Sequence, residues 1–484
     1  MLKEHSTCLI IFDYVCTTNL LYVSASSVKH FNISERKILL RIVDVLSAIV
    51  GIYVFSEYHE LSYFDIQQSD VIWYVLLSFY ILLFGTIFEI YDLQKAESRF
   101  KIFKNLTLAI LLTVLFFLLT PVYTPSLPAN RIEIVYFFGI LLLSIFLWRI
   151  FYISVITSPR FYRNSVIVGD NYNPVEVKKE LEKSDPHFFV RAYLHTGNEA
   201  VYGMGEDCVA LAHDALESFV INNNISEIIV TNSFKGVDNK LARILIPLLR
   251  KGYSIRSYSH VYEDLSSKVP VQNVGNDFYC YFPFSKSHNN KLYQTFHRFM
   301  DIIVGTIGLM FLCLILPFVM LINLLFNKGP IFYKQVRVGK NGKHYLIYKL
   351  RTMVKDAEKK GAQWATKNDA RITVFGNILR KTRLDEVPQF INVFKGDMSF
   401  IGPRPERPHF VEELEKRIPF YEIRHVIKPG VTGWAQVNAK YASSAEDTLE
   451  KLQFDLYYIK NRNVFLDLRI LLKTFSTVIF FRGQ

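Results

Sequence analysis

Residues 384–390, LDEVPQF, place two carboxylates side by side, Asp385 and Glu386, just ahead of a proline. Proline is tolerated only in the first turn of a helix, and apolar residues recur after it at helical spacing. The pattern therefore predicts a helix that starts close to Asp385. An aspartate there can cap the helix, and the positive end of the helix dipole also attracts phosphate.

Two interpretations of this acidic pair stay open on the residues alone. The first is a capping pair on a surface turn. The second is a magnesium-dependent phosphoryl-transfer site, because Mg²⁺ typically takes one or two carboxylates and completes its shell with substrate oxygens.

Basic residues surround the pair in the sequence. Lys349 and Arg351 alternate on one face of a predicted hairpin, residues 330–353. Arg380 belongs to a second basic cluster, and Arg404 stands between two prolines, where a guanidinium on a stiff segment suits bidentate phosphate binding. Each pattern also fits an ordinary surface, as a solvated edge strand or a turn.

The composition of the whole chain points to acidic partners. Half of the 484 residues are apolar and the formal net charge is +12. Anionic lipid and phosphorylated substrates fit this charge. Nucleic acid is the weakest of the three possible partners and is not expected, because no basic-aromatic tract or finger spacing occurs. The five cysteines show no CxxC pair, so we expect reduced thiols without a metal or disulfide role.

Four apolar runs are long enough to cross a bilayer, near 38–56, 71–90, 105–121 and 134–156. The loop at 57–70 carries four acidic residues and no lysine or arginine, whereas the loops on the other side are basic. The positive-inside rule then predicts a four-helix transmembrane region over 1–157, with the N-terminus and everything after it in the cytoplasm.

Strand and helix patterns alternate over residues 158–270, which predicts a parallel, Rossmann-like α/β domain. The turn after its first strand keeps a single glycine of the dinucleotide fingerprint, Gly169. One glycine after a strand is weak evidence for a cofactor, so a structural or regulatory module is favoured over NAD binding.

A fifth apolar run covers residues 301–329 and contains Pro317 near its middle. Proline removes a backbone hydrogen bond and bends a helix, and basic residues flank both ends of the run. We expect a re-entrant helix at about 297–327 that enters and leaves by the cytoplasmic face. A kinked helix that spans the membrane is the alternative.

The last part of the chain resembles the bacterial sugar transferase family, the monotopic polyprenol-phosphate phosphoglycosyl transferases. The family's motifs occur in order: HRFMD (297–301), LP at the bend (316–317), FYKQVRVGKNGKHYLIYKLRTM (332–353), RKTRLDEVPQFINVFKGDMSFIGPRP (380–405), KPGVTGWAQVN (428–438) and FDLYYIKNRNVFLDLRILLKT (454–474). Each motif alone is weak evidence for the family, but six motifs in the family's order are specific to it. The upstream spans and Rossmann-like module are similar to the large members, which initiate exopolysaccharide, capsule or O-antigen synthesis.

The resemblance implies the transfer of a sugar 1-phosphate from a UDP-sugar to undecaprenyl phosphate, with release of UMP. It implies Asp385 as the nucleophile that forms a phosphosugar ester, and Glu386 with Mg²⁺ as the groups that hold the diphosphate. By analogy with the large members, UDP-glucose or UDP-galactose is expected as the donor.

Further polar residues match positions that the family uses. The cations expected near the phosphates are Lys349, Arg380 and Arg404, with Arg351 beside them. Gln436 and Asp455 match other polar positions, for which a turn hydrogen bond and a helix-surface acid are the ordinary explanations. Ala439 departs from the family's usual glycine.

The predicted topology agrees with this chemistry, since UDP-sugars are cytosolic. We therefore expect a catalytic domain at 290–484 on the cytosolic face of a bacterial inner membrane, made of the re-entrant helix and an α+β part. The apolar and basic C-terminal stretch fits an interfacial helix. A homo-oligomer is left open.

Two other function classes compete with this prediction. A non-catalytic, nucleotide-sensing membrane scaffold of a polysaccharide assembly would bind a UDP-sugar without releasing UMP. A membrane-bound NAD-dependent epimerase or dehydratase would need a full glycine fingerprint and a Tyr-x-x-x-Lys pair, and residues 158–270 offer neither.

Overall fold

The computed structural model divides into two compact units, Met1–Ser266 and Ser267–Gln484. It describes residues 33–58, 62–64, 70–91, 99–128, 130–155, 162–169, 172–185, 187–195, 208–231, 239–271, 291–326, 329–354, 357, 369–439 and 445–479. The expected boundary between the second and third domains, the C-terminal end of the predicted re-entrant helix and most of the predicted loop charges lie outside these residues.

The first unit begins with apolar helices at the positions of the four predicted runs. These are α2 (Ile33–Tyr58), α3 (Val71–Ile87), α5 (Arg99–Leu118) and α6 (Ile132–Val155). By length and composition α2 and α6 can cross a membrane, while α3 and the apolar part of α5 are shorter. Among the described residues the sequence therefore predicted the apolar helices correctly, and the count of four spans stays a prediction.

Polar groups join α2 to α6 inside this bundle. The guanidinium of Arg149 donates to Asp44 at 2.5 Å, and both side chains are almost fully buried. Large apolar side chains such as Ile42, Leu46 and Leu147 are exposed on the outer surfaces of these helices. This distribution is typical of helices that face lipid.

The predicted parallel α/β domain is confirmed. Its strands are β1 (Arg163–Val168), β2 (Phe188–Leu194), β3 (Val209–Ala210), β4 (Glu227–Val230) and β5 (Ser254–Ser257), all parallel in the order β3-β2-β1-β4-β5. The helices between and after them are α7 (Pro174–Ser184), α8 (Leu216–Asn222), α9 (Asn239–Arg250) and α10 (Tyr258–Ser266).

One helix of this domain is shorter than its sequence indicates. The sequence DCVALAHDALESFVINN, residues 207–223, predicts a helix throughout. Val209 and Ala210 instead pair with β2 as an edge strand, and the helical turns begin only at His213. Gly169, at the end of β1, has φ 134°, a conformation that favours glycine. Its place in the fold is therefore explained by backbone geometry alone.

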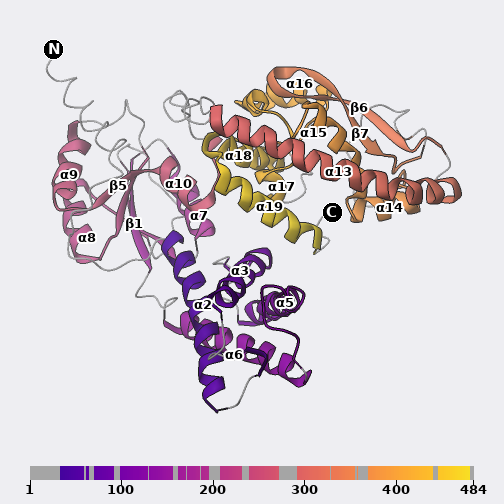
Figure 1. Cartoon of the computed structure of the whole chain (residues 1–484). Coiled ribbons are helices and arrows are strands. Elements are labelled where there is room, and N and C mark those ends of the chain that lie inside the picture. The colour runs from indigo at the N-terminus through magenta and orange to yellow at the C-terminus, as the bar shows by residue number, and fades with distance from the viewer. Residues whose placement is uncertain are drawn as a thin grey trace. The chain divides into compact units, whose positions relative to one another are not determined.

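The second unit has an α+β fold built on one long helix (Figure 1). Its elements are α13 (Lys291–Phe326), β6 (Phe332–Val338), β7 (His344–Leu350), α14 (Val374–Lys381), the 3₁₀ segment η7 (Leu384–Gln389), α15 (Phe390–Lys395), β8 (Ser399–Ile401), α16 (Pro408–Arg417), η8 (Tyr421–Val426), β9 (Gly430–Thr432), α17 (Trp434–Asn438), α18 (Ala445–Asn461) and α19 (Val464–Ile479). The predicted hairpin is confirmed as the antiparallel pair β6–β7, and β8 pairs with β9 in parallel.

Helix α13 continues through Pro317 as one 36-residue helix. It starts six residues before the predicted position, and its re-entrant path through a membrane stays a prediction. Two glycines allow it to approach the segment that follows the acidic pair. A Cβ on Gly308 would lie 2.2 Å from the ring of Phe390, and one on Gly305 would lie 3.4 Å from the backbone of Phe394.

Candidate active site

The acidic pair lies at the start of a helical segment, as predicted, but Asp385 is not its N-cap. Arg383 occupies the capping position with φ 58° and no capping side chain, and Asp385 is the second residue of the tight 3₁₀ turn η7. This left-handed residue lies two residues beyond the end of α14, and the helical segment is capped two residues before the predicted position at Asp385. Asp385 and Glu386 are both 8% exposed.

Glu386 is held by three cations. Lys349 Nζ and Arg404 Nη2 donate to its Oε1 at 2.9 and 2.8 Å, and Arg383 Nη1 lies 3.5 Å from Oε2. Burial alone would raise the pKa of Glu386, but the charges of the surrounding cations, Arg404 first, hold it well below its usual range. Glu386 is therefore a fixed carboxylate.

The carboxylate of Asp385 is different. It accepts no hydrogen bond and joins no ion pair within the part of the chain that the structure describes. Burial, and then the negative charge of Glu386, raise its pKa to about 6, against the attraction of Lys349, Arg380 and Arg404. An ionised carboxylate without a hydrogen-bond partner is a suitable nucleophile or metal ligand.

Two of the predicted cations come from elements next to η7. Lys349 lies on β7 opposite Tyr333, and burial lowers the pKa of its ammonium group, against the attraction of Glu386. Arg380, in the last turn of α14, donates to Thr352 Oγ1 at 2.9 Å, and its charge acts on Asp385. The hairpin and α14 thus place positive charge around the acidic pair.

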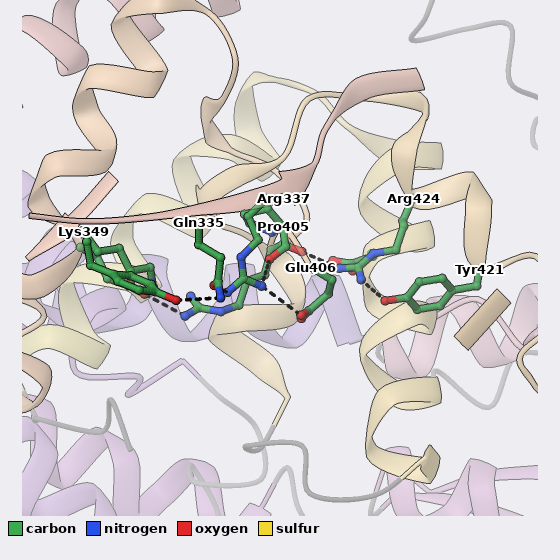
Figure 2. A network of polar contacts seen from close by, with 11 residues as sticks. Gln335, Arg337, Lys349, Pro405, Glu406, Tyr421 and Arg424 are labelled. Carbon is green, nitrogen blue, oxygen red and sulfur yellow. Dashed lines mark hydrogen bonds and ion pairs between the residues drawn. The ribbon is translucent and has the colours of Figure 1, made fainter. Parts of the chain in front are cut away.

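Arg404 is positioned through its backbone. Arg424, on η8, donates from Nη2 to the carbonyl of Arg404 at 2.9 Å and to Asp455 Oδ2 at 3.0 Å, and from Nη1 to Tyr421. Figure 2 shows Arg424 and Arg337 on either side of Glu406, in the segment that carries Arg404. Arg337 donates to the carbonyl of Pro405 at 3.1 Å.

Asp455 therefore belongs to the support of the site. Its carboxylate is buried, which raises its pKa to about 6 against the attraction of Arg424 and Lys451. The ordinary explanation of Asp455 as an exposed acid on a helix surface is wrong, because it is 3% exposed and paired.

Comparison with known proteins agrees with the motifs of this unit. The family model for bacterial sugar transferases matches residues 292–481. An uncharacterized sugar transferase of Bacillus subtilis is 40% identical over 159 residues, which are 32% of this chain and 73% of that protein. The chain belongs to the bacterial sugar transferase family.

Two longer relatives carry functional names. A UDP-N-acetylgalactosamine-undecaprenyl-phosphate N-acetylgalactosaminephosphotransferase of Aeromonas hydrophila is 46% identical over 189 residues, 39% of this chain and 44% of that protein. A UDP-glucose:undecaprenyl-phosphate glucose-1-phosphate transferase of Escherichia coli is 41% identical over 181 residues, 37% of this chain and 39% of that protein. The matched segments thus span about two fifths of these relatives.

Two predicted residues of the sugar transferase unit make no hydrogen bond or ion pair with the acidic pair among the described residues. Arg351 follows the end of β7, and its guanidinium donates to the carbonyls of Pro330 and Met353, at 2.7 and 3.1 Å. Gln436, on α17, has a buried Nε2 with no hydrogen-bond partner among the described residues. Whether either residue binds substrate stays a prediction.

Ala439 ends α17 with φ −81° and ψ 149°, an extended conformation that any residue adopts. The replacement of the sugar transferase family's usual glycine therefore requires no strained backbone here.

The sequence did not single out Arg337 or Arg424, and it named Arg383 only as a member of the basic cluster that precedes the acidic pair. The positive φ of Arg383 has no local signal, since arginine gains nothing from it. Arg424 is separated from Asp455 by 31 residues and from Arg404 by 20, so no spacing rule connects them.

The residues present fit a magnesium ion held by few protein groups. No cluster of three or more metal-ligating side chains occurs among the residues that the structure describes. Mg²⁺ is commonly bound through one or two carboxylates plus substrate phosphates, and the unpartnered carboxylate of Asp385 beside Glu386 offers such a pair. The donor chemistry is therefore compatible with Mg²⁺.

Proposed function

We propose that this chain transfers a sugar 1-phosphate from a UDP-sugar to undecaprenyl phosphate and releases UMP. The observation that carries the proposal is the contrast within the acidic pair, where Glu386 is fixed by cations and Asp385 is unpartnered. The names of the Aeromonas and Escherichia relatives support the substrate classes.

In the first step an Asp385 carboxylate oxygen attacks the β-phosphorus of the UDP-sugar. A phosphorus–oxygen bond to the carboxylate forms, the bond to UMP breaks, and UMP leaves with the electron pair. In the second step an oxygen of undecaprenyl phosphate attacks the same phosphorus and releases the Asp385 carboxylate. Two displacements at one phosphorus replace a single displacement between two anionic substrates.

The cations around the pair have the charge and position to hold the phosphates. Arg404 is the most accessible, with its side chain 40% exposed, whereas Lys349 is 19% exposed. Their charge stabilises the developing negative charge on the phosphoryl oxygens. Asp385 and Glu386 would hold a bound Mg²⁺, which would supply further neutralisation of the diphosphate.

Glu386 would then act without changing its protonation state. Because Lys349 and Arg404 share its Oε1, this carboxylate fixes the two cations relative to each other before the substrate arrives. Preorganised charge of this kind needs no rearrangement during the reaction.

We also propose that the reaction occurs at the cytoplasmic face of a bacterial inner membrane, with α13 entering and leaving by that face. Its apolar length and the supply of UDP-sugars in the cytosol support this orientation. Single cysteines at Lys291 and Pro330, both exposed, test it in sealed vesicles. Labelling of both from the same side is expected, and labelling from opposite sides would refute the re-entrant path.

The activity is tested with purified full-length protein, undecaprenyl phosphate, Mg²⁺ and a panel of UDP-glucose, UDP-galactose and UDP-N-acetylgalactosamine. The preference for glucose or galactose stays a prediction, since the relatives' names include both glucose and N-acetylgalactosamine. UMP release with one of these donors is expected. Binding of a donor without UMP release would favour the scaffold function instead.

A further inference from the structure

A cavity of about 230 Å³ lies in the second unit, away from the acidic pair. Its lining comes from the N-terminal part of α13, the β6–β7 turn, β8, the segment before β9 and the end of α18, and includes neither Asp385 nor Glu386. Phe394, whose carbonyl accepts a hydrogen bond from the lining residue Arg298, follows Asp385 by nine residues.

The wall of this cavity carries an excess of positive charge. Four cations line it, Arg298, Lys340, Lys428 and Arg462, against one carboxylate, Asp301. Asp301 is already engaged, because its Oδ1 accepts from Ser399 Oγ and the Phe400 amide, both at 2.8 Å. It therefore does not neutralise the four cations by direct pairing.

Arg298 donates to the backbone carbonyls of Val393 and Phe394, whereas the two lysines of the lining make neither an ion pair nor a side-chain hydrogen bond among the described residues. Neither the Lys340 nor the Lys428 ammonium makes an ion pair with any residue that the structure describes. Lys428 is half-buried, and burial together with the charge of Arg298 lowers the pKa of its ammonium group, against the attraction of Asp301 and Asp397. Two ammonium groups that line one cavity without a directly bound counter-ion form a site for an anion.

The surroundings favour an anion at a membrane surface. Helix α13 leads from the cavity directly into its apolar stretch, and Leu292 and Phe299 on the same turns are 84% and 57% exposed. On α19, Phe465 is 85% exposed. Exposed aromatic and aliphatic residues beside lysines are the combination that holds a protein at an anionic lipid surface.

We propose that this cavity is a second anion site, which binds a phosphate group between Lys340 and Lys428. The phosphate could belong to a glycerophospholipid headgroup or to a soluble phosphate compound, and the exposed apolar residues favour the headgroup. The site is separate from the one at which a lipid phosphate would meet Asp385, so it does not depend on the proposed transferase activity.

The test measures acetylation of individual lysines by acetic anhydride in the full-length protein, read by mass spectrometry. Vesicles of phosphatidylcholine with phosphatidylglycerol are compared with phosphatidylcholine alone. About fivefold protection of Lys340 and Lys428 by phosphatidylglycerol is expected, from the usual contribution of a lysine at an anionic surface. Lys416, exposed on α16 and outside the cavity, is the control and should label equally in both.

A second arm uses inorganic phosphate in uncharged detergent, compared with chloride at equal ionic strength. Protection by phosphatidylglycerol alone identifies a headgroup site, and protection by inorganic phosphate identifies a site for soluble phosphate. Protection by neither, or equal protection of Lys416, would overturn the proposal.

Variants separate this site from the active site. Lys340→Gln with Lys428→Gln should weaken phosphatidylglycerol binding about twenty-fivefold, the product of two fivefold effects, while Lys416→Gln should not change it. Asp385→Asn should keep the binding in full, whatever its effect on UMP release. If the double variant fails to fold, the labelling of the unaltered protein still decides the question.

Discussion

Asp385 and Glu386 are adjacent in the chain and equally buried, yet only Glu386 is bound by cations. Lys349 and Arg404 meet on one oxygen of Glu386, while the Asp385 carboxylate accepts no hydrogen bond from the described residues. The two acids therefore have different roles in the proposed reaction: Glu386 holds the two cations in place, and Asp385 is available to react.

The raised pKa of Asp385 predicts an acid limb in the pH profile. The proposed nucleophile must be ionised, and its pKa is about 6. We expect kcat/KM for UMP release to fall about tenfold for each pH unit below 6 and to be level from about pH 7. Glu386→Gln removes the neighbouring negative charge and should move this limb to lower pH, with a rate loss of about 100-fold or more. If the acid limb of Glu386→Gln stays at the same pH, the assignment of this limb to Asp385 is contradicted.

The same pKa predicts that Asp385→Asn stabilises the fold. A carboxyl group with a raised folded-state pKa contributes stability below its unfolded-state pKa near 4, and this stability is lost as the pH rises through 6. The neutral amide avoids that loss. Thermal unfolding in detergent should show Asp385→Asn more stable by about 1–3 kcal/mol at pH 7.5 and equal to the unaltered protein near pH 4. Equal stability at both pH values would refute this.

The buried pair of Arg424 and Asp455 should be important for both stability and activity. Arg424→Ala leaves a buried carboxylate without its partner, which costs about 3–5 kcal/mol. Arg424→Lys keeps the charge but cannot reach Asp455, Tyr421 and the Arg404 carbonyl together, so we expect kcat/KM to fall about tenfold with a smaller loss of stability. The control is Arg417→Ala, which removes an exposed pair with Glu413 and should change stability by less than about 1 kcal/mol.

Helix α13 should tolerate no side chain at Gly308. Gly308→Ala places a methyl group against the ring of Phe390, at the start of α15, and overpacking of this kind costs about 1–3 kcal/mol. We expect a lower unfolding temperature and slower UMP release. Gly139→Ala on α6 is the matched control, because a Cβ there meets no atom within 4 Å. Equal effects of the two substitutions would show that the contact with Phe390 has no special importance.

Much of the fold could be predicted because its signals are local. The apolar runs, the β6–β7 hairpin and the strand–helix alternation each depend on residues close in sequence. The edge strand Val209–Ala210 was missed because two residues carry too little pattern, and its strand character comes from pairing with β2. Arg351 was grouped with Lys349 by period-two alternation, but β7 ends at Leu350 and the alternation ends with it.

The difference between the two acids could not be predicted, because it is not local. Lys349 precedes Glu386 by 37 residues and Arg404 follows it by 18, and only the folded chain places both on one oxygen. The motif order identified the residues that gather there. The individual contacts of these residues could be assigned only from the structure.

The most direct test of the account is a reaction without the lipid acceptor. Full-length protein with Mg²⁺ and the UDP-sugar that it uses should release about one UMP per active site, and the protein should gain one sugar phosphate. Mass spectrometry of proteolytic fragments should locate this group on Asp385, and addition of undecaprenyl phosphate should remove it. Asp385→Asn should show neither the UMP burst nor the added mass. Near-normal turnover by Asp385→Asn, or a sugar phosphate on another residue, would contradict the central claim.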